Sequence, residues 1–291
     1  MSMNYQYKVP FRTKVLNIPR RVFKWGALEH FLSRNIQPES NFLKKIVPPE
    51  YLYAKGSWRT SDRKGLRMNL DISNVVDHEI YFNLYDRSFE NYLNGLKDVG
   101  TFWDIGANIG WTALQVNGKF PQARIFAFEP SSRNRKRLEE NISLNNANIQ
   151  VVPYGLGNEP STFKLYSVLE SNPGMNRIMN DEKDLPYETI EVITADTFWN
   201  NIGRPKVAAL KMDVEGFEMF VLKGMEEMIS SCKPAMFMEV DDKILASHGF
   251  SAAYLLTWLH DRGYGIHDAQ TGKKLLPPFT DLSPHFDIVA K

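Results

Sequence analysis

The sequence predicts an α/β fold in which helices cover both faces of a mostly parallel sheet. From Thr101 onward, short apolar runs alternate with segments of helical periodicity, as in repeated strand–helix–strand units. Runs such as Ile125–Phe128 are apolar at successive positions, which burial on both faces of a sheet requires. The last run, Phe286–Ala290, follows a turn-rich connection with no helical pattern, and this predicts an antiparallel final strand.

Seven strands and four helices account for the alternation. The predicted strands are Thr101–Ile105, Arg124–Phe128, Ile149–Val152, Val207–Met212, Ala235–Val240, Tyr264–His267 and Phe286–Ala290. The predicted helices are Trp111–Lys119, Ser132–Leu144, Phe217–Ser230 and Ala252–Arg262.

An insertion follows the third strand. The segment Leu169–Tyr187 contains Ser171-Asn-Pro-Gly, whose residue types favour turns, and it lies between further strand candidates at Thr162–Val168 and Thr189–Ile193. Loops of this kind often carry function, so the insertion is predicted to be a lid or substrate loop.

Residues 1–98 form a predicted cap and substrate region that precedes the main domain at 99–291. Prolines break residues 1–50, which are expected to be irregular apart from a candidate amphipathic helix at Val22–Leu32. A strand is predicted over Gly65–Asp71 and a helix over Glu79–Leu96.

Charge is distributed unevenly along the chain. Residues 1–70 hold 14 Lys and Arg against 4 Asp and Glu, whereas the remainder holds 21 against 30 and the whole chain carries a net charge of +1. One interpretation is a basic cap that docks on an acidic body. The other is a surface for an anionic substrate, a lipid headgroup or nucleic acid.

The composition is that of a soluble globular protein, with 43% hydrophobic and 24% charged residues. The single Cys232 excludes an internal disulfide framework and a cysteine-based metal site. No apolar run approaches the ~20 residues that span a bilayer, and the N-terminus has no apolar core of a signal peptide. The expected location is therefore the cytoplasm.

The most informative segment is Thr101–Gly110, where an apolar strand ends at Asp104 and a glycine-rich turn leads into a helix. Glu129 ends the next strand, nineteen residues after Gly110. Glycines let a backbone approach a ligand closely, and an acid at this spacing can hold a ribose through its hydroxyls. The spacing is Asp-x-Gly-x-x-x-Gly, so a dinucleotide dehydrogenase with its Gly-x-Gly-x-x-Gly cradle is disfavoured.

Polar residues also follow the other strands. The third strand ends at Pro153-Tyr154-Gly155, the fourth at Asp213-Val-Glu-Gly216 and the fifth at Glu239-Val-Asp-Asp242. Ligands of open α/β sheets bind at the carboxyl ends of the strands. The repetition therefore predicts one shared site at that edge of the sheet.

Four motifs in register resemble those of the class I S-adenosylmethionine-dependent methyltransferases, and more narrowly the FkbM family. They are Asp104-Ile-Gly-Ala-Asn-Ile-Gly110, Phe128-Glu-Pro130, Leu156-Gly157 and Lys211-Met-Asp-Val-Glu-Gly216, and the similarity covers roughly residues 65–270. The resemblance implies a Rossmann-like class I methyltransferase sheet, mostly parallel and seven-stranded with the last strand antiparallel. Residues 99–291 would be the S-adenosylmethionine-binding methyltransferase domain.

The resemblance also implies roles for single residues. Glu129 would accept hydrogen bonds from the ribose, and Asp213 would lie near the donated methyl or the methionine ammonium. Tyr154 would contact the adenine, although ordinary packing at a strand end is an equal alternative. The complete set expected to hold S-adenosylmethionine is Asp104, Gly106, Ala107, Asn108, Gly110, Glu129, Pro130, Tyr154, Gly155 and Asp213.

Methyl transfer to a hydroxyl benefits from a general base near the attacking oxygen. The candidates are Asp213, Glu239 and His248, and a carboxylate beside a second carboxylate can have a raised pKa. Glu215 has a competing role, because an acid is favourable where a helix begins, and His248 could be an ordinary loop residue. Asp213 with Glu239 or Asp241 could pair on a metal, but neither spacing nor resemblance requires one, so none is predicted.

The predicted function is O-methylation of a hydroxyl on a small molecule, polyketide or saccharide. An RNA methyltransferase is an alternative suggested by the basic N-terminal region, but no aromatic-plus-basic RNA module is visible and nucleic acid is not the expected partner. A non-catalytic S-adenosylmethionine-binding scaffold is the second alternative. Contact with a membrane or another anionic surface through the basic region remains open, as does oligomerisation.

Overall fold

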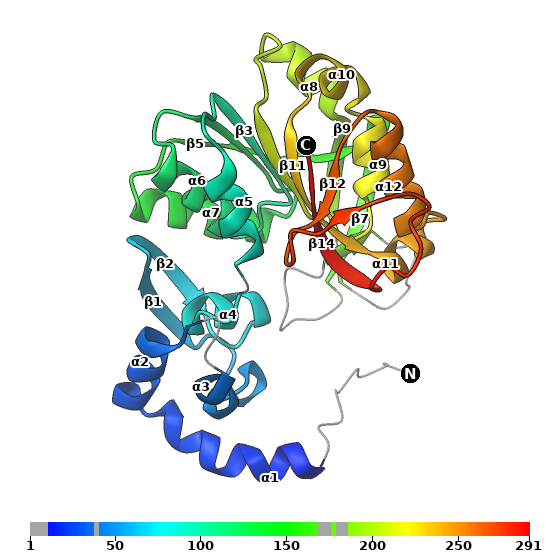
Figure 1. The fold of residues 1–291 in the computed structure, drawn as a ribbon. Coiled ribbons are helices and arrows are strands. Elements are labelled where there is room, and N and C mark those ends of the chain that lie inside the picture. Colours follow the sequence, from blue (N-terminus) through cyan, green and yellow to red (C-terminus); the bar gives the residue numbers. More distant parts are fainter. Residues whose placement is uncertain (1–10, 38–40, 86, 168–175, 179–185) are drawn as a thin grey trace. The chain divides into compact units, whose positions relative to one another are not determined.

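The computed structural model describes residues 11–37, 41–85, 87–167, 176–178 and 186–291. Two compact units are present: the N-terminal region up to Asp86, and a larger unit that contains Arg87–Tyr166 and Tyr187–Lys291 (Figure 1). The sequence placed this boundary at residue 98.

The N-terminal unit combines short helices with a β-hairpin. Its elements are α1 (Phe11–Arg20), the 3-10 turn η1 (Arg21–Lys24), α2 (Gly26–Asn35), α3 (Asn41–Ile46), η2 (Glu50–Leu52), β1 (Trp58–Arg63), β2 (Leu66–Asp71) and α4 (Val75–Phe82). The hairpin turns at Lys64-Gly65, where both residues have positive φ, and Arg63 pairs with Leu66.

The expectation that residues 1–50 are irregular is wrong for the described part, which is mainly helical. The prolines mark ends of elements and do not prevent them. Pro19 lies in the last turn of α1, and Pro48 and Pro49 separate α3 from η2. The candidate helix at Val22–Leu32 is split between η1 and α2.

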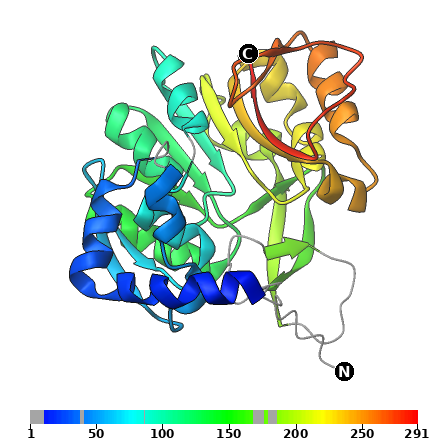
Figure 2. The same ribbon diagram turned by 60° about the horizontal axis from the view of Figure 1, so that its bottom comes forward.

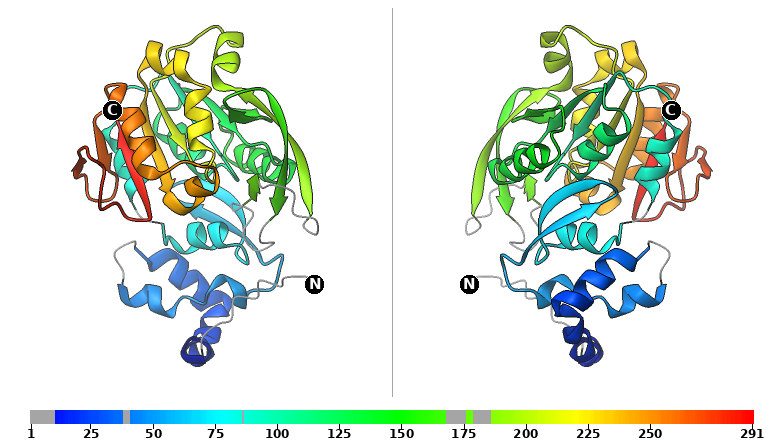
Figure 3. Two further views of the ribbon diagram at one scale, coloured as in Figure 1. Left: turned by 90° about the vertical axis from the view of Figure 1, so that its right-hand side faces the viewer. Right: turned by 90° about the vertical axis from the view of Figure 1, so that its left-hand side faces the viewer.

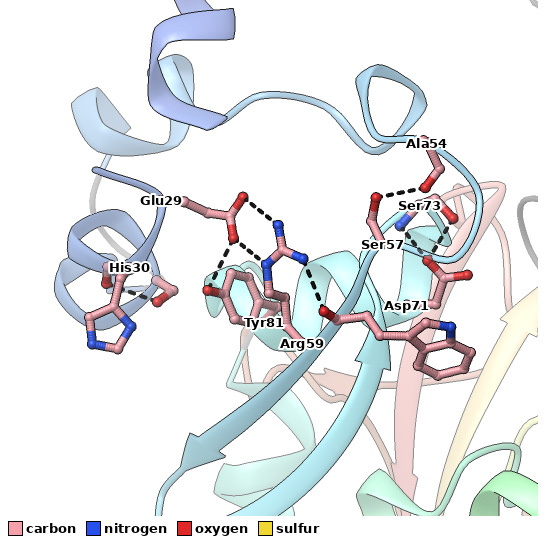
Figure 4. Close-up of polar contacts among 10 residues, drawn as sticks. Glu29, His30, Ala54, Ser57, Arg59, Asp71, Ser73 and Tyr81 are labelled. Atoms are coloured by element: carbon pink, nitrogen blue, oxygen red, sulfur yellow. Dashed lines mark hydrogen bonds and ion pairs between the residues drawn. The ribbon is translucent and has the colours of Figure 1, made fainter. Parts of the chain in front are cut away.

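A buried ion pair joins α2 to the hairpin of the N-terminal unit (Figure 4). The Glu29 carboxylate is fully enclosed, and Arg59 contacts it with Nε at 2.6 Å from Oε1 and Nη2 at 3.2 Å from Oε2. The hydroxyl of Tyr81 donates to Glu29 Oε1 at 3.4 Å. Burial raises the pKa of Tyr53, and the nearby charge of Glu29 adds to the effect.

The larger unit is built on one extended sheet. Its strands are β3 (Thr101–Ile105), β4 (Arg124–Phe128), β5 (Ile149–Val152), β10 (Ala209–Met212), β11 (Ala235–Asp241), β12 (Ile266–Asp268), β13 (Lys274–Leu275) and β14 (His285–Ala290). The order is β13-β12-β14-β11-β10-β3-β4-β5. The neighbouring strands β5, β4, β3, β10 and β11 are parallel to one another, and β14 is antiparallel to β11. The predicted antiparallel last strand is confirmed, and the short β13 extends the edge beyond the seven predicted strands.

Helices cover both faces of this sheet (Figures 2 and 3). Phe102 of β3 packs against apolar residues of three helices on one face, and Trp103 packs against those of other helices on the opposite face. The first group is α5 (Ser88–Gly95), α6 (Trp111–Lys119) and α7 (Ser132–Leu144). The second is α8 (Ala195–Asn201), α9 (Glu218–Lys223), α10 (Glu226–Cys232), α11 (Asp242–Ser247) and α12 (Ala252–Asp261).

Two predicted helices are each divided in the structure, and two further helices were not predicted. The predicted helix Glu79–Leu96 is two helices, because Asn83 takes a left-handed conformation that ends α4. The predicted helix Phe217–Ser230 is also two, with Gly224 at the break, where a Cβ would lie 1.9 Å from the Gly157 carbonyl oxygen. The sequence did not predict α8 or α11.

A smaller sheet carries the flanks of the insertion. Its strands are β6 (Gly155–Gly157), β7 (Ser161–Ser167), β8 (Asn176–Ile178) and β9 (Tyr187–Thr194), in the order β6-β9-β7-β8. Strands β7 and β9 pair antiparallel, with Lys164 opposite Thr189. Most of the predicted lid, at 169–175 and 179–185, lies outside the described residues.

The Glu29–Arg59 pair gives a stability prediction. Replacing Arg59→Met leaves the Glu29 carboxylate buried without its cation, so we expect the free energy of unfolding of the N-terminal unit to fall by about 3 kcal/mol. Urea unfolding followed by circular dichroism measures this. In the control Arg67→Met, the exposed partner Asp62 lies 4.0 Å away, and the change should stay below about 1 kcal/mol. Equal effects in the two variants would contradict the prediction.

Candidate active site

Asp104 ends β3 in the centre of the sheet, between Ala127 of β4 and Lys211 of β10. Its side chain is fully buried, and the Ala113 amide acts on it as a hydrogen-bond donor. Burial raises the pKa of Asp104 to about 6, although the charge of Lys211 and the Ala113 amide oppose the rise. The carboxyl group therefore lies buried at the base of the glycine turn with unused acceptor capacity.

The glycine turn requires its glycines because other parts of the chain approach it. Gly106 has φ of 82°, and a Cβ there would lie 1.9 Å from the Asp213 carbonyl oxygen. Gly110 has φ of 91°, and its Cβ would meet Leu138 Cδ1 at 2.5 Å. The sequence attributed these glycines to a close approach of ligand. The structure shows that packing of the chain on itself already demands them.

Glu129 ties the turn to the end of β4. Its Oε2 accepts from the Asn108 amide and its Oε1 from the Ser131 amide, both at 2.9 Å. Burial raises the pKa of Glu129 to about 7, against the effect of those two amides. The side chain of Asn134 contributes a further hydrogen bond to this carboxyl group. A carboxylate has about four acceptor sites, so acceptor capacity remains for a ligand. Arg135 holds the neighbouring backbone by donating to the carbonyls of Glu129 and Pro130.

Asn108 lies in the same turn with φ of 48°, a left-handed conformation that costs energy for a residue other than glycine. Its side-chain Oδ1 is buried and has no hydrogen-bond partner among the described residues. Ala107 beside it is buried in the apolar cluster beneath α6. The turn thus presents a polar atom that only a further group would satisfy.

Tyr154 and Gly155 lie where β5 passes into β6. Tyr154 is half-buried and packs against the main core, and a Cβ on Gly155 would lie 3.1 Å from Val192 Cγ2. These contacts give both residues a packing role. Their contact with adenine stays a prediction.

Two carboxylates and a lysine meet at the ends of β10 and β11. Asp213 and Glu239 share a side-chain hydrogen bond, and Lys211 Nζ lies 3.1 Å from Asp213 Oδ2 and 3.3 Å from the Gly106 carbonyl oxygen. Burial opposes the charge of Lys211, but Asp213, Asp104 and Glu239 together raise its pKa. The ammonium group therefore stays charged at neutral pH.

The carboxylate pair holds one proton. The charge of Asp213, followed by burial, raises the pKa of Glu239. Burial opposes ionisation of Asp213, but Lys211 and the hydrogen bond from Glu239 lower its pKa. Two adjacent carboxyl groups titrate as a unit, and here the proton belongs mainly to Glu239. The sequence named these two residues as base candidates, and the structure brings them together.

His285 is a member of this group that sequence reasoning missed. It is the first residue of β14 and pairs with Asp241 of β11. Its Nε2 lies 3.2 Å from Glu239 Oε1 and its Nδ1 lies 3.5 Å from Asp241 Oδ2. Asp241 is fixed because its other oxygen accepts from the Lys243 and Ile244 amides at the start of α11. The half-exposed imidazole thus connects the carboxylate pair to solvent.

The loop after Asp213 has a strained path. Glu215 has φ of 52° and Gly216 has φ of 96°. Glu218 satisfies the loop, since its Oε1 accepts from the Val214 and Gly216 amides at 3.2 Å. The helix-start role that the sequence gave to Glu215 therefore falls to Glu218, and the charge of Glu215 contributes to the raised pKa of Glu239.

His248 follows α11, and its ring lies against two aromatic side chains. The ring centroids are 5.5 Å from Phe217 and 6.0 Å from Phe220, both in edge-on geometry. A Cβ on Gly216 would lie 3.1 Å from the His248 ring. Packing accounts for this position, and a catalytic role for His248 stays a prediction.

No group of three or more His, Cys, Asp or Glu side chains within the described ranges is arranged to hold a metal ion. The cluster of Lys211, Asp213, Glu239 and His285 offers groups for hydrogen bonding and proton transfer.

The strand order β5-β4-β3-β10-β11-β14-β12, with β14 antiparallel and acids at the strand ends, defines a Rossmann-like class I methyltransferase fold. Residues 104–266, more than half of the chain, match the methyltransferase FkbM domain. The chain belongs to the FkbM methyltransferase family.

Several known proteins are similar to this chain. Methyltransferase sdnD of Sordaria araneosa is 31% identical over 43% of this chain and 60% of its own length. Hexuronic acid methyltransferase AglP of Haloferax volcanii is 31% identical over 48% of this chain and 55% of its own length. The chain thus spans less than two thirds of either relative. The crystal structure of an FkbM methyltransferase from Methylobacillus flagellatus aligns with a TM-score of 0.44 and 20% identity, over 72% of this chain and 50% of that one.

Glu218 gives a prediction about pH. Burial raises the pKa of this carboxyl from 4.5 to about 7. A raised pKa means that the folded state binds the Glu218 proton more tightly than the unfolded state does. Proton binding at Glu218 therefore stabilises the fold fully below pH 4.5, and this stabilisation is lost as pH rises through 7. We expect Glu218→Gln to gain stability relative to the wild type between pH 5 and pH 8, by about 3 kcal/mol or less.

Urea unfolding at both pH values measures the effect. The exposed Glu159→Gln variant is the control and should show the same difference from the wild type at both values. A Glu218→Gln difference that is also independent of pH would show that this carboxyl group is ionised throughout.

Proposed function

We propose that the chain is an S-adenosylmethionine-dependent O-methyltransferase that acts on a hydroxyl group of a small molecule or saccharide. The observation that carries this proposal is the Asp213–Glu239 pair beside the glycine turn, which Lys211 anchors on one side and His285 contacts on the other. The family membership supports methyl transfer.

The residues around the turn fit the cofactor. Asn108 Oδ1 is buried and has no hydrogen-bond partner among the described residues. The Glu129 carboxyl accepts from the Asn108 and Ser131 amides and from Asn134, and it keeps acceptor capacity for a ligand. Glu129 would hold the ribose hydroxyls, the turn at 106–110 would hold the methionine end, and Tyr154 would contact the adenine. When bound, S-adenosylmethionine supplies a methyl group already activated on a sulfonium.

The protein must then orient the acceptor and remove its proton. As the acceptor hydroxyl is methylated, its proton would pass to the ionised Asp213. Lys211 keeps Asp213 ionised before the reaction. The hydrogen bond to Glu239 and the contact with His285 provide a route for that proton to solvent. This is general-base catalysis by a carboxylate pair.

A saccharide is the acceptor that we favour. The similar protein from Haloferax volcanii is named as a hexuronic acid methyltransferase, and it matches over 48% of this chain. Glucuronate, its simple glycosides and neutral sugars therefore form the first acceptor panel. S-adenosylhomocysteine release and the mass gain of the acceptor report the reaction.

The ribose contact predicts a loss of cofactor affinity in Glu129→Ala. A hydrogen bond to a charged group contributes about 1.5–3 kcal/mol, so titration calorimetry should show affinity for S-adenosylmethionine weakened by about tenfold to a hundredfold. The exposed Glu140→Ala on α7 is the matched control and should bind as the wild type does. Unchanged affinity in Glu129→Ala would remove the ribose assignment.

The proton route predicts separate effects on catalysis and binding. Asp213→Asn should lower kcat by about a hundredfold or more, the usual contribution of a general base. His285→Gln should lower kcat less and flatten its dependence on pH, with affinity for S-adenosylmethionine unchanged, because the imidazole lies against Glu239 and Asp241. The exposed His260→Gln is the control. A wild-type pH profile in His285→Gln would exclude the route, and no S-adenosylhomocysteine release from any acceptor or from a crude glycan extract would favour a binding scaffold.

A further inference from the structure

The first helix of the N-terminal unit turns its polar face toward the protein. Asn17 Nδ2 donates to the Tyr51 hydroxyl at 2.9 Å, and Arg20 Nε donates to the Lys45 carbonyl at 2.8 Å. Farther along, Lys24 donates to the Leu52 carbonyl and lies 5.1 Å from the Tyr53 ring centroid. Positions 17, 20 and 24 have helical spacing, so one polar stripe fixes α1 and η1 on the residues around α3 and η2.

The opposite stripe is apolar and lies on the side of α1 and η1 away from α3 and η2. We call it the apolar row, and it consists of Val15, Ile18, Val22 and Trp25. Their exposed fractions are 48%, 67%, 49% and 72%. The spacing of three and four residues keeps Val15, Ile18 and Val22 on one side of α1 and η1, and Trp25 follows η1 as its C-cap in extended backbone. A helix on a soluble protein normally buries its apolar stripe. In α1 and η1 the polar stripe is instead turned inward and the apolar stripe is exposed.

The position of the row is consistent with an outer surface of the unit. In Figures 1 and 3, α1 lies on the far side of α2 and α3 from the β1–β2 hairpin. The neighbouring helices add exposed Phe31 and Phe42. Apolar side chains with this exposure on one small unit indicate a binding surface.

Positive charges border the apolar row. Lys14 and Arg21 are exposed and lie next to Val15 and Val22 in the chain. They belong to the strongly basic region 1–70, with 14 Lys and Arg against 4 Asp and Glu. Apolar side chains flanked by cations match the interface of an anionic bilayer, where the chains enter the acyl boundary and the cations meet the headgroups.

We propose that α1 and η1 form a membrane-surface anchor, which lies flat on an anionic lipid bilayer with the apolar row inserted. Three of the four residues in the row, Val15, Ile18 and Val22, are aliphatic and gain little from nucleic-acid bases, which bind proteins by stacking on aromatic rings such as that of Trp25. A second copy of the chain would bring like charges together. No helix among the described residues is long and apolar enough to cross a bilayer, and a surface anchor needs none. The anchor does not depend on the proposed catalytic function.

Co-sedimentation of the full chain with vesicles tests the proposal. Vesicles of phosphatidylcholine with phosphatidylglycerol should bind the protein at least tenfold better than phosphatidylcholine alone, and high salt should reduce the difference. Ile18→Asp and Trp25→Asp should each weaken binding to the anionic vesicles by about tenfold or more. The matched control is Leu276→Asp, because Leu276 is 63% exposed in the other unit, and it should bind normally.

A charge variant separates the two contributions. Lys14→Glu combined with Arg21→Glu should abolish the preference for anionic vesicles. Circular dichroism checks that each variant is folded.

Three results would overturn the proposal. The first is no binding to anionic vesicles at low salt, or equal binding by Ile18→Asp and the wild type. The second is a dimer in sedimentation velocity that Ile18→Asp dissociates while vesicles bind neither protein, which would make the row a self-association surface. The third is salt-sensitive binding of single-stranded RNA, weakened in the charge variant, without vesicle binding.

Discussion

The buried ammonium group of Lys211 is the interaction on which the site depends. It reaches from the middle strand of the sheet to the Asp213 carboxylate and the Gly106 carbonyl, and its charge also acts on Asp104. An isolated ammonium group would be too costly to bury, but three acids surround this one. The lysine therefore holds the glycine turn, the end of β10 and the ionisation state of the carboxylate pair in one arrangement.

The backbones of Gly106 and Asp213 lie in direct contact. A side chain at residue 106 would overlap the Asp213 carbonyl, so the two strand-end loops meet backbone to backbone. The same closeness brings the glycine turn and the Asp213–Glu239 pair into one site, and our proposal assigns cofactor binding to the first and proton removal to the second. His285 lies against this pair and is half-exposed to solvent.

Polar contacts stabilise the N-terminal unit. Its interior is fixed by the Glu29–Arg59 pair and by polar side chains of α1 that face inward. The apolar side chains of α1 face outward, and this inversion is the basis of the proposed membrane-surface anchor. The strongly basic composition of residues 1–70 was visible in the sequence, but the choice between docking on the protein and contacting an outside surface required the direction of each side chain.

The sequence by itself determined the central sheet, the acids at its strand ends and the glycine turn. Strands such as Thr101–Ile105 and helices such as Ser132–Leu144 agree with the structure at both ends, because hydrophobic periodicity and caps are local signals. It also named Asp213 and Glu239. Only the tertiary structure decided that they share a proton, that Glu218 and not Glu215 satisfies the loop, and that His285 belongs to the site. The register of β14 against β11 pairs residues more than forty positions apart in the chain. The protonation state of a carboxyl group depends on the charges and hydrogen bonds around it in space, and neither can be inferred from local sequence.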